Sequence, residues 1–276
     1  MSSAVRRVRP RRRGQPTGLP PVLVPFAVLA LLFLLLPVAG LLVRAPWRSM
    51  PAVLTQPAAL DALRLSIVCA SAATVLCVLL GVPLAWLLAR AEFRGRSVVR
   101  ALVTVPLVLP PVVGGVALFT ALGRRGIVGR PLDEWFGVSL PFTTPAVVVA
   151  EAFVAMPFLV IAVEGALRGA DRRLEDAAST LGATRWYTFR RVTLPLVAPG
   201  LAAGAVLCWA RALGEFGATI TFAGNFPGTT RTMPVEVFIA LQRGDPAAAI
   251  ALSLVLLLVS VTVLALLRER WLGALR

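Results

Sequence analysis

Arg211, Glu215 and Thr219 recur every four residues in an otherwise apolar stretch, so a helix would place them along one line. Together with Thr221 they offer a guanidinium, a carboxylate and two hydroxyls. Ionisable residues at membrane depth usually pair with one another and often mark a pathway. Two interpretations stay open. These four residues shape a translocation path for an anion, or Arg211 and Glu215 form an internal ion pair that orients the helix.

Composition excludes several kinds of enzyme. The 276 residues include no lysine and no histidine. A chain without lysine cannot form the phosphate-binding loop that ends in Gly-Lys-Ser/Thr, and a chain without histidine cannot build a Ser-His hydrolase or a His-Glu-x-x-His metalloprotease. The cysteines, Cys69, Cys77 and Cys208, have no metal-ligand spacing. We therefore predict no catalytic residue, no metal site and no cofactor in this chain.

A charged segment near the middle of the chain is the second candidate site. Two acidic residues, two alanines, a glycine and a Leu-Pro pair stand at fixed spacing: Glu175, Asp176, Ala177, Ala178, Gly182, Leu194 and Pro195. Carboxylates favour the start of a helix, and a glycine often ends one in the left-handed conformation. Thr184 suits the N-cap of a second short helix. Residues 169–195 are therefore expected to form a helix-turn-helix elbow whose small side chains another protein could approach closely.

The elements that must position these residues are long and apolar. Hydrophobic residues make up 58% of the chain, and the mean hydropathy is +0.85. Because every backbone amide in lipid must be satisfied within its own segment, such runs predict helices. The sequence therefore predicts an all-α membrane protein with six transmembrane helices, at about residues 21–44, 65–89, 101–122, 145–167, 196–216 and 246–267.

The arginines predict the orientation of these helices. Of the 28 arginines, 19 fall before the first span, in alternate loops or after the last span, 8 fall in the other loops, and Arg211 lies within a span. Cytosolic segments carry the excess of positive charge, so both termini, a basic tail over 1–20 and the charged segment are expected in the cytosol. The net charge of +15 then reports topology and contact with membrane lipid, and we predict no binding of nucleic acid.

The charged segment resembles the signature loop of ABC-importer permeases. That loop reads Glu/Asp-Ala-Ala, three residues, Gly, nine residues, an aliphatic residue, one residue and Leu-Pro, which is the spacing from Asp176 to Pro195. Asp176 is the one departure, because the family usually has Glu there. The resemblance implies a type I ABC importer permease fold. It also implies that 169–195 is a cytosolic coupling loop on which a separate ATPase docks through the seven residues named above.

A longer stretch, Arg211 to Asn225 followed by Pro227 to Pro234, resembles the molybdate permeases among these importers. Phe216 and the Ala-Thr-Ile-Thr run over 218–221 favour them over the related sulfate permeases. The resemblance extends over about 60–267. It implies a homodimer with two cytosolic ATP-binding subunits that use ATP and Mg²⁺, an extracytoplasmic substrate-binding protein and an oxyanion substrate. The location it implies is multi-pass in the bacterial plasma (inner) membrane.

Three alternatives remain open from the sequence. One is a sulfate or thiosulfate permease of the same family. The second is a proton-coupled secondary anion transporter, which could use Glu151, Glu164 and Glu215 as carriers and would need no ATPase. The third is a purely structural membrane anchor, although an anchor has no reason to carry Arg211 and Glu215 at depth.

Overall fold

The computed structural model describes residues 22–272, with side chains described as far as residue 265. The predicted basic tail, 1–20, lies outside the described residues. The chain divides into two compact parts, the first ending at Arg44 and the second beginning at Ala45. In the first part, α1 (Leu23–Arg44) is a single apolar helix of 22 residues, which is long enough to cross a membrane. It corresponds to the predicted first transmembrane helix.

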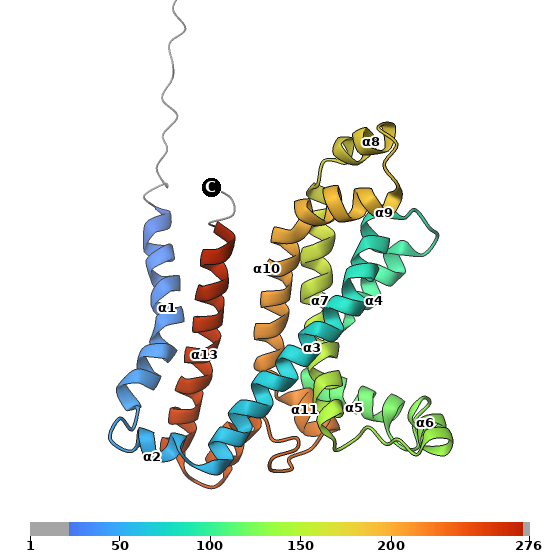
Figure 1. Ribbon diagram of the computed structural model, residues 1–276. Helices are drawn as coiled ribbons and strands as arrows, with labels where there is room; N and C mark the ends of the chain where they lie inside the picture. Colours follow the sequence, from blue (N-terminus) through green and yellow to red (C-terminus); the bar gives the residue numbers. More distant parts are fainter. Residues whose placement is uncertain (1–21, 273–276) are drawn as a thin grey trace, which may run out of the picture. The chain divides into compact units, whose positions relative to one another are not determined.

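The second part is also helical, and the described residues contain no strand, which confirms the all-α prediction. Its elements are α2 (Met50–Leu54), α3 (Pro57–Arg90), α4 (Arg96–Val108), α5 (Pro111–Leu122), α6 (Gly129–Phe136), α7 (Thr144–Gly169), α8 (Arg172–Thr180), α9 (Arg185–Thr188), η1 (Phe189–Thr193), α10 (Leu194–Leu213), α11 (Gly217–Phe222), α12 (Met233–Gln242) and α13 (Pro246–Leu272) (Figure 1). Over the described residues, five helical runs are long and apolar enough to span a membrane, or six if α4 and α5 count as one broken span.

The core of the second part forms where α3, α7 and α10 pack together. Small side chains dominate this contact, among them Ala73, Ala155 and Ala212, all fully buried. Gly200 and Gly204 of α10 lie against Ala166 and Ala162 of α7. A Cβ added at either glycine would come within 2.4 or 2.9 Å of those alanine side chains. Small residues let helices approach closely in a membrane, where packing rather than hydrophobic burial drives association.

The predicted third span, 101–122, is two helices in the structure. α4 and α5 meet at an angle of 118°. Leu109 between them is extended (φ −67°, ψ 132°), and Pro110 and Pro111 follow it. A residue before proline is pushed out of the helical region, and the prolines cannot donate the missing hydrogen bonds. The break is therefore encoded locally, although its angle is larger than that of a kinked helix.

The predicted fifth span, 196–216, also ends differently. α10 stops at Leu213, the chain turns through Gly214 to Phe216, and the short helix α11 follows. Gly224, with φ +79°, then takes the chain out of α11. Figure 1 shows α8 and α9 at one end of the packed helices of the second part, with α6 and α11 at the opposite end. The two candidate sites therefore lie at opposite ends of α10.

Candidate functional site

The elbow predicted over 169–195 is confirmed in its local details. Asp171 caps α8 by accepting a hydrogen bond from the backbone N–H of Arg173 at 3.0 Å. Gly182 turns the chain with φ +83°, a conformation that glycine adopts without a steric penalty. Thr184 then caps α9, accepting from the N–H of Tyr187 at 3.3 Å. Each of these features depends on neighbouring residues alone.

The second arm of the elbow does not stop before the membrane span. α9, η1 and α10 follow one another without a gap, so that Arg185–Leu213 is one helical run of 29 residues. η1 is a π-helical turn over Phe189–Thr193, and Leu194 donates its N–H to the carbonyl of Phe189. Pro195, which has no N–H, follows directly in the first turn of α10. The π-turn accommodates the proline and keeps the two segments joined.

Glu175, predicted to contact an ATPase, faces residues of its own chain. Its Oε1 accepts hydrogen bonds from Arg90 Nη2 at 2.7 Å and from Thr193 Oγ1 at 3.0 Å. Arg90 is the last residue of α3, and Thr193 ends η1. The carboxylate thus ties α8 to two other elements. The side chains of Arg90 and Glu175 are 11% and 21% exposed, so water weakens this ion pair only partly.

The other predicted coupling residues leave an open face. Asp176, Ala177, Gly182 and Pro195 are exposed, while Ala178 and Leu194 are half-buried. Between the two arms of the elbow lies a notch of about 510 Å³, lined by Ala178, Leu181, Gly182, Ala183, Thr184 and Tyr187. Leu181 is 88% exposed, which is unusual for a large aliphatic side chain unless another molecule covers it. The small residues and the exposed Leu181 together make this face suitable for contact with another protein.

At the opposite end of α10, Arg211 and Glu215 form the predicted ion pair, with 2.6 Å between Nη2 and Oε2. Glu215 is 1% exposed, and its second oxygen accepts from the N–H of Ala218 at 2.8 Å. Both carboxylate oxygens therefore have donors within the chain, and the second contact holds the start of α11. This arrangement agrees with an orienting role for Glu215. Arg211 remains partly accessible, with 28% of its side chain exposed.

Arg211, Glu215 and Thr219 do not lie along one continuous helix, because α10 ends at Leu213 and both Thr219 and Thr221 belong to α11. Thr219 is fully buried, and its hydroxyl has no hydrogen-bond partner. Thr221 donates to the carbonyl of Gly217 at 2.8 Å. Its oxygen lies against Gly115 of α5 so closely that a Cβ there would meet it at 1.7 Å. The hydroxyl of Thr221 is thus part of the α5–α11 contact.

Sequence reasoning missed several charged contacts. Arg90, which the sequence identifies only as one of the cytosolic arginines, pairs with Glu175. Glu164, considered as a proton carrier, instead accepts hydrogen bonds from Arg100 and Arg168, each with an Nη2–Oε1 distance of 2.7 Å. Glu151 is 1% exposed, and its Oε2 has no partner. The part of the chain that the structure describes holds no group of three or more His, Cys, Asp or Glu residues that could bind a metal ion.

Comparison with known protein families places the elbow and α10 in one family domain. A sequence model of the binding-protein-dependent transport system inner membrane component matches residues 81–272, which include the elbow and all of α10 to α13. The chain belongs to this family. As an inner membrane component of a transport system, it is a membrane subunit whose elbow and α10 fall within the matched region.

Individual relatives of this membrane component extend the match over most of the chain. The Mycobacterium tuberculosis molybdenum transport system permease protein ModB is 50% identical over 249 residues, covering 90% of this chain and 93% of the relative. The Escherichia coli protein of the same name is 43% identical and covers 79% and 98%. The Escherichia coli sulfate transport system permease protein CysT is 36% identical, covering 84% and 85%.

Solved structures confirm the fold of this membrane component. A chain of a bacterial alginate ABC transporter, determined in complex with an alginate pentasaccharide-bound periplasmic protein, has a TM-score of 0.72 at 20% identity, covering 90% of this chain and 91% of that one. A chain of the inward-facing MetNI methionine ABC transporter has a TM-score of 0.62 at 18% identity and covers 79% and 96%. The helical arrangement is therefore that of the membrane subunits of ABC transporters.

Proposed function

We propose that this chain is the permease subunit of an ATP-driven importer that carries molybdate into the cytoplasm. The observation that carries the proposal is the difference between relatives. Identity reaches 50% and 43% with two molybdenum permeases but 36% with a sulfate permease. Molybdate and tungstate are both tetrahedral dianions, so we expect tungstate to share the path. Sulfate or thiosulfate is the second candidate cargo.

The proposed complex contains two copies of this chain, two cytosolic ATP-binding subunits and an extracytoplasmic substrate-binding protein. Nucleotide and Mg²⁺ belong to the ATP-binding subunits, because this chain lacks the lysine that a phosphate-binding loop requires. The arginine distribution supports placement in a bacterial plasma membrane with both termini and the elbow in the cytoplasm. The notch between α8 and α9 is then the surface offered to the ATPase.

Coupling would pass through Glu175. A push on α8 reaches α3 through Arg90 and reaches η1 through Thr193, since both donate to the same carboxylate oxygen. η1 continues into α10, which ends beside the Arg211–Glu215 pair. From Thr193 to Arg211 the helix rises roughly 27 Å at about 1.5 Å per residue. One helical run thus joins the ATPase contact to the proposed path.

We expect the path itself to hold its cargo weakly. A dianion enclosed without countercharge would pay a large desolvation cost, so some positive charge is needed. Arg211 is a partly exposed cation at this end of α10, and its ion pair with Glu215 offsets part of its attraction for an anion. This balance suits brief passage, with selection left to the binding protein.

The test is uptake of labelled molybdate by proteoliposomes that contain this chain, its ATPase and its binding protein. ATP-dependent uptake that excess tungstate suppresses and equal sulfate leaves largely intact would support the proposal. Preferential uptake of sulfate would instead identify sulfate, the second candidate, as the cargo. Uptake by vesicles that contain the chain alone, driven by a proton gradient, would refute the ATP-driven mechanism.

A further inference from the structure

A second cavity, separate from the elbow notch, lies between α3 and the second arm of the elbow. Its volume is about 450 Å³, and its walls are Val82, Pro83 and Trp86 from α3 and Arg185, Trp186 and Phe189 from α9 and η1. Phe189 meets Trp86 edge-on at 5.2 Å between ring centres and stacks on Trp186 at 5.6 Å. The walls are thus mainly aromatic and aliphatic, with one cation.

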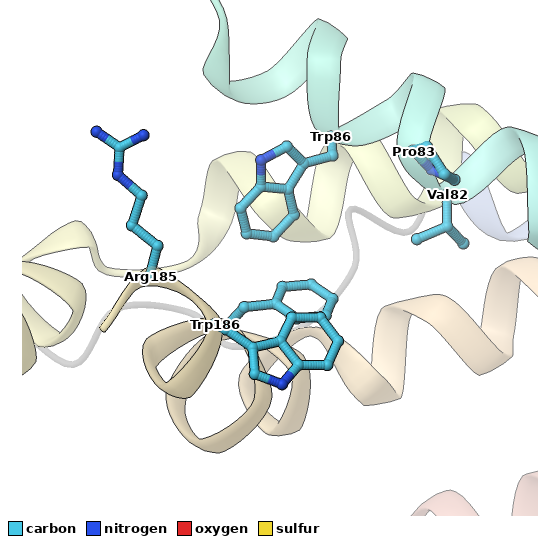
Figure 2. Close-up of a pocket in the computed structure, with 6 residues that line it drawn as sticks. Val82, Pro83, Trp86, Arg185 and Trp186 are labelled. Atoms are coloured by element: carbon cyan, nitrogen blue, oxygen red, sulfur yellow. The ribbon is translucent and has the colours of Figure 1, made fainter. Parts of the chain in front are cut away.

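The lining residues are ordered from polar to apolar. Figure 2 shows Arg185 at one end, Trp86 and Trp186 in the middle, and Val82 with Pro83 at the other end; the Phe189 ring contacts both indole rings. Arg185 is exposed, and its guanidinium has no acceptor among the described residues. Arg90, by contrast, is engaged by Glu175 and lies over the Trp86 ring at 6.0 Å. A ligand that fits this gradient has an anionic head and an apolar tail.

The residues around the cavity are of the types expected at a membrane boundary. Trp86 is one helical turn before Arg90, where α3 ends, and the next residues carry Arg94, Arg96 and Arg100. On the same stretch of α3, Leu79, Leu80 and Leu87 are exposed, as expected of a surface that faces lipid. Tryptophan is enriched at the level of the lipid headgroups, where its ring meets acyl chains and its N–H meets water.

We propose that this cavity binds an anionic phospholipid, with the phosphate at Arg185 and an acyl chain running past Trp86 and Phe189 toward Pro83. The assignment to the cytosolic leaflet rests on the orientation given under the proposed function. Cytosolic leaflets are rich in anionic lipid, which attracts basic residues at the surface. The volume falls within the range of about 300–1,000 Å³ that is usual for small-molecule sites.

A lipid suits the cavity better than a side chain of the ATPase. Half of the lining residues belong to α3, a membrane span, and the only charged one is at the rim. The notch between α8 and α9, which is lined by Leu181 and Tyr187, is a different surface and remains free for the ATPase. A bound lipid would fill the space between α3 and the elbow, and so would brace the same two elements that Glu175 joins.

The test uses the complete complex with its ATPase in nanodiscs of phosphatidylcholine with a minority of phosphatidylglycerol. After extraction into mild detergent, the lipids that stay bound are counted by native mass spectrometry. The variants are Arg185→Gln, which removes the cation, and Trp86→Ala, which removes a wall. Arg94→Gln is the matched control, because Arg94 is an exposed arginine shortly after the end of α3 that does not line the cavity.

Wild-type protein and Arg94→Gln should both retain phosphatidylglycerol in preference to phosphatidylcholine. Arg185→Gln should reduce that preference roughly fivefold, which is the contribution of one interfacial cation. Trp86→Ala should reduce retention of both lipids. Equal losses in Arg185→Gln and Arg94→Gln would overturn the proposal in favour of diffuse surface charge. Release of the ATPase from Arg185→Gln with unchanged lipid would overturn it in favour of a protein contact. No transport is measured, so the identity of the cargo does not affect the result.

Discussion

Replacing Arg90 with glutamine should loosen α8 although the two residues at the contact lie 85 positions apart. Arg90 donates one hydrogen bond to the Glu175 carboxylate at 2.7 Å, and both side chains are largely shielded from water. Hydrogen bonds to charged groups contribute about 1.5–3 kcal/mol. With the exposure of this pair, we expect about 1–2 kcal/mol, or roughly 5- to 30-fold in the equilibrium between held and released α8.

Amide hydrogen exchange measures this equilibrium directly, because local opening of a helix exposes its N–H groups. Protection over 172–180 should fall by that factor in Arg90→Gln and in Glu175→Gln. In the double variant, protection should fall no further than in the less protected of the two single variants, because both changes remove the same Arg90–Glu175 ion pair. Arg173→Gln, an exposed change on the same helix, is the control. Unchanged protection in Arg90→Gln, or additive losses in the double variant, would refute the reasoning.

Three further changes test other contacts. Gly115→Ala should destabilise the α5–α11 contact by about 1–3 kcal/mol, because the new Cβ overlaps Thr221; Gly114→Ala, which meets only a phenylalanine side chain at 3.2 Å, should cost less in the same thermal-stability assay. Glu215→Gln should lower uptake of labelled molybdate while membrane insertion and yield stay normal. Uptake at the wild-type level in this variant would show that the Arg211–Glu215 ion pair has only a structural role. Gly182→Asp should release or uncouple the ATPase in a pull-down and hydrolysis assay, whereas Gly182→Ala, which adds strain at φ +83° without charge, should keep most of the ATPase bound.

The sequence predicted what neighbouring residues determine. The turn at Gly182 and the cap at Thr184 follow from local chemistry, and apolar length located the spans. The partner of Glu175 could not be predicted, because Arg90 lies far away in the chain and its charge was already explained by topology. The predicted fifth span extends to about residue 216, three residues past the end of α10 at Leu213, and the sequence leaves open whether 216–225 continues as a helix or bends. Gly217 and Gly224 permit either a helix or a turn; in the structure the chain turns before α11, whose first residue, Gly217, packs closely on Pro111.

The π-turn at η1 has a mechanical consequence. Because Arg185 to Leu213 is helical without a gap, the elbow arm and the span are one hydrogen-bonded run of 29 residues, which bends where the arm meets α10 (Figure 1). A displacement imposed at Tyr187 would therefore pass into α10 through helical hydrogen bonds. A hinge of loose backbone at the same place would have absorbed that displacement before it left the cytoplasmic surface.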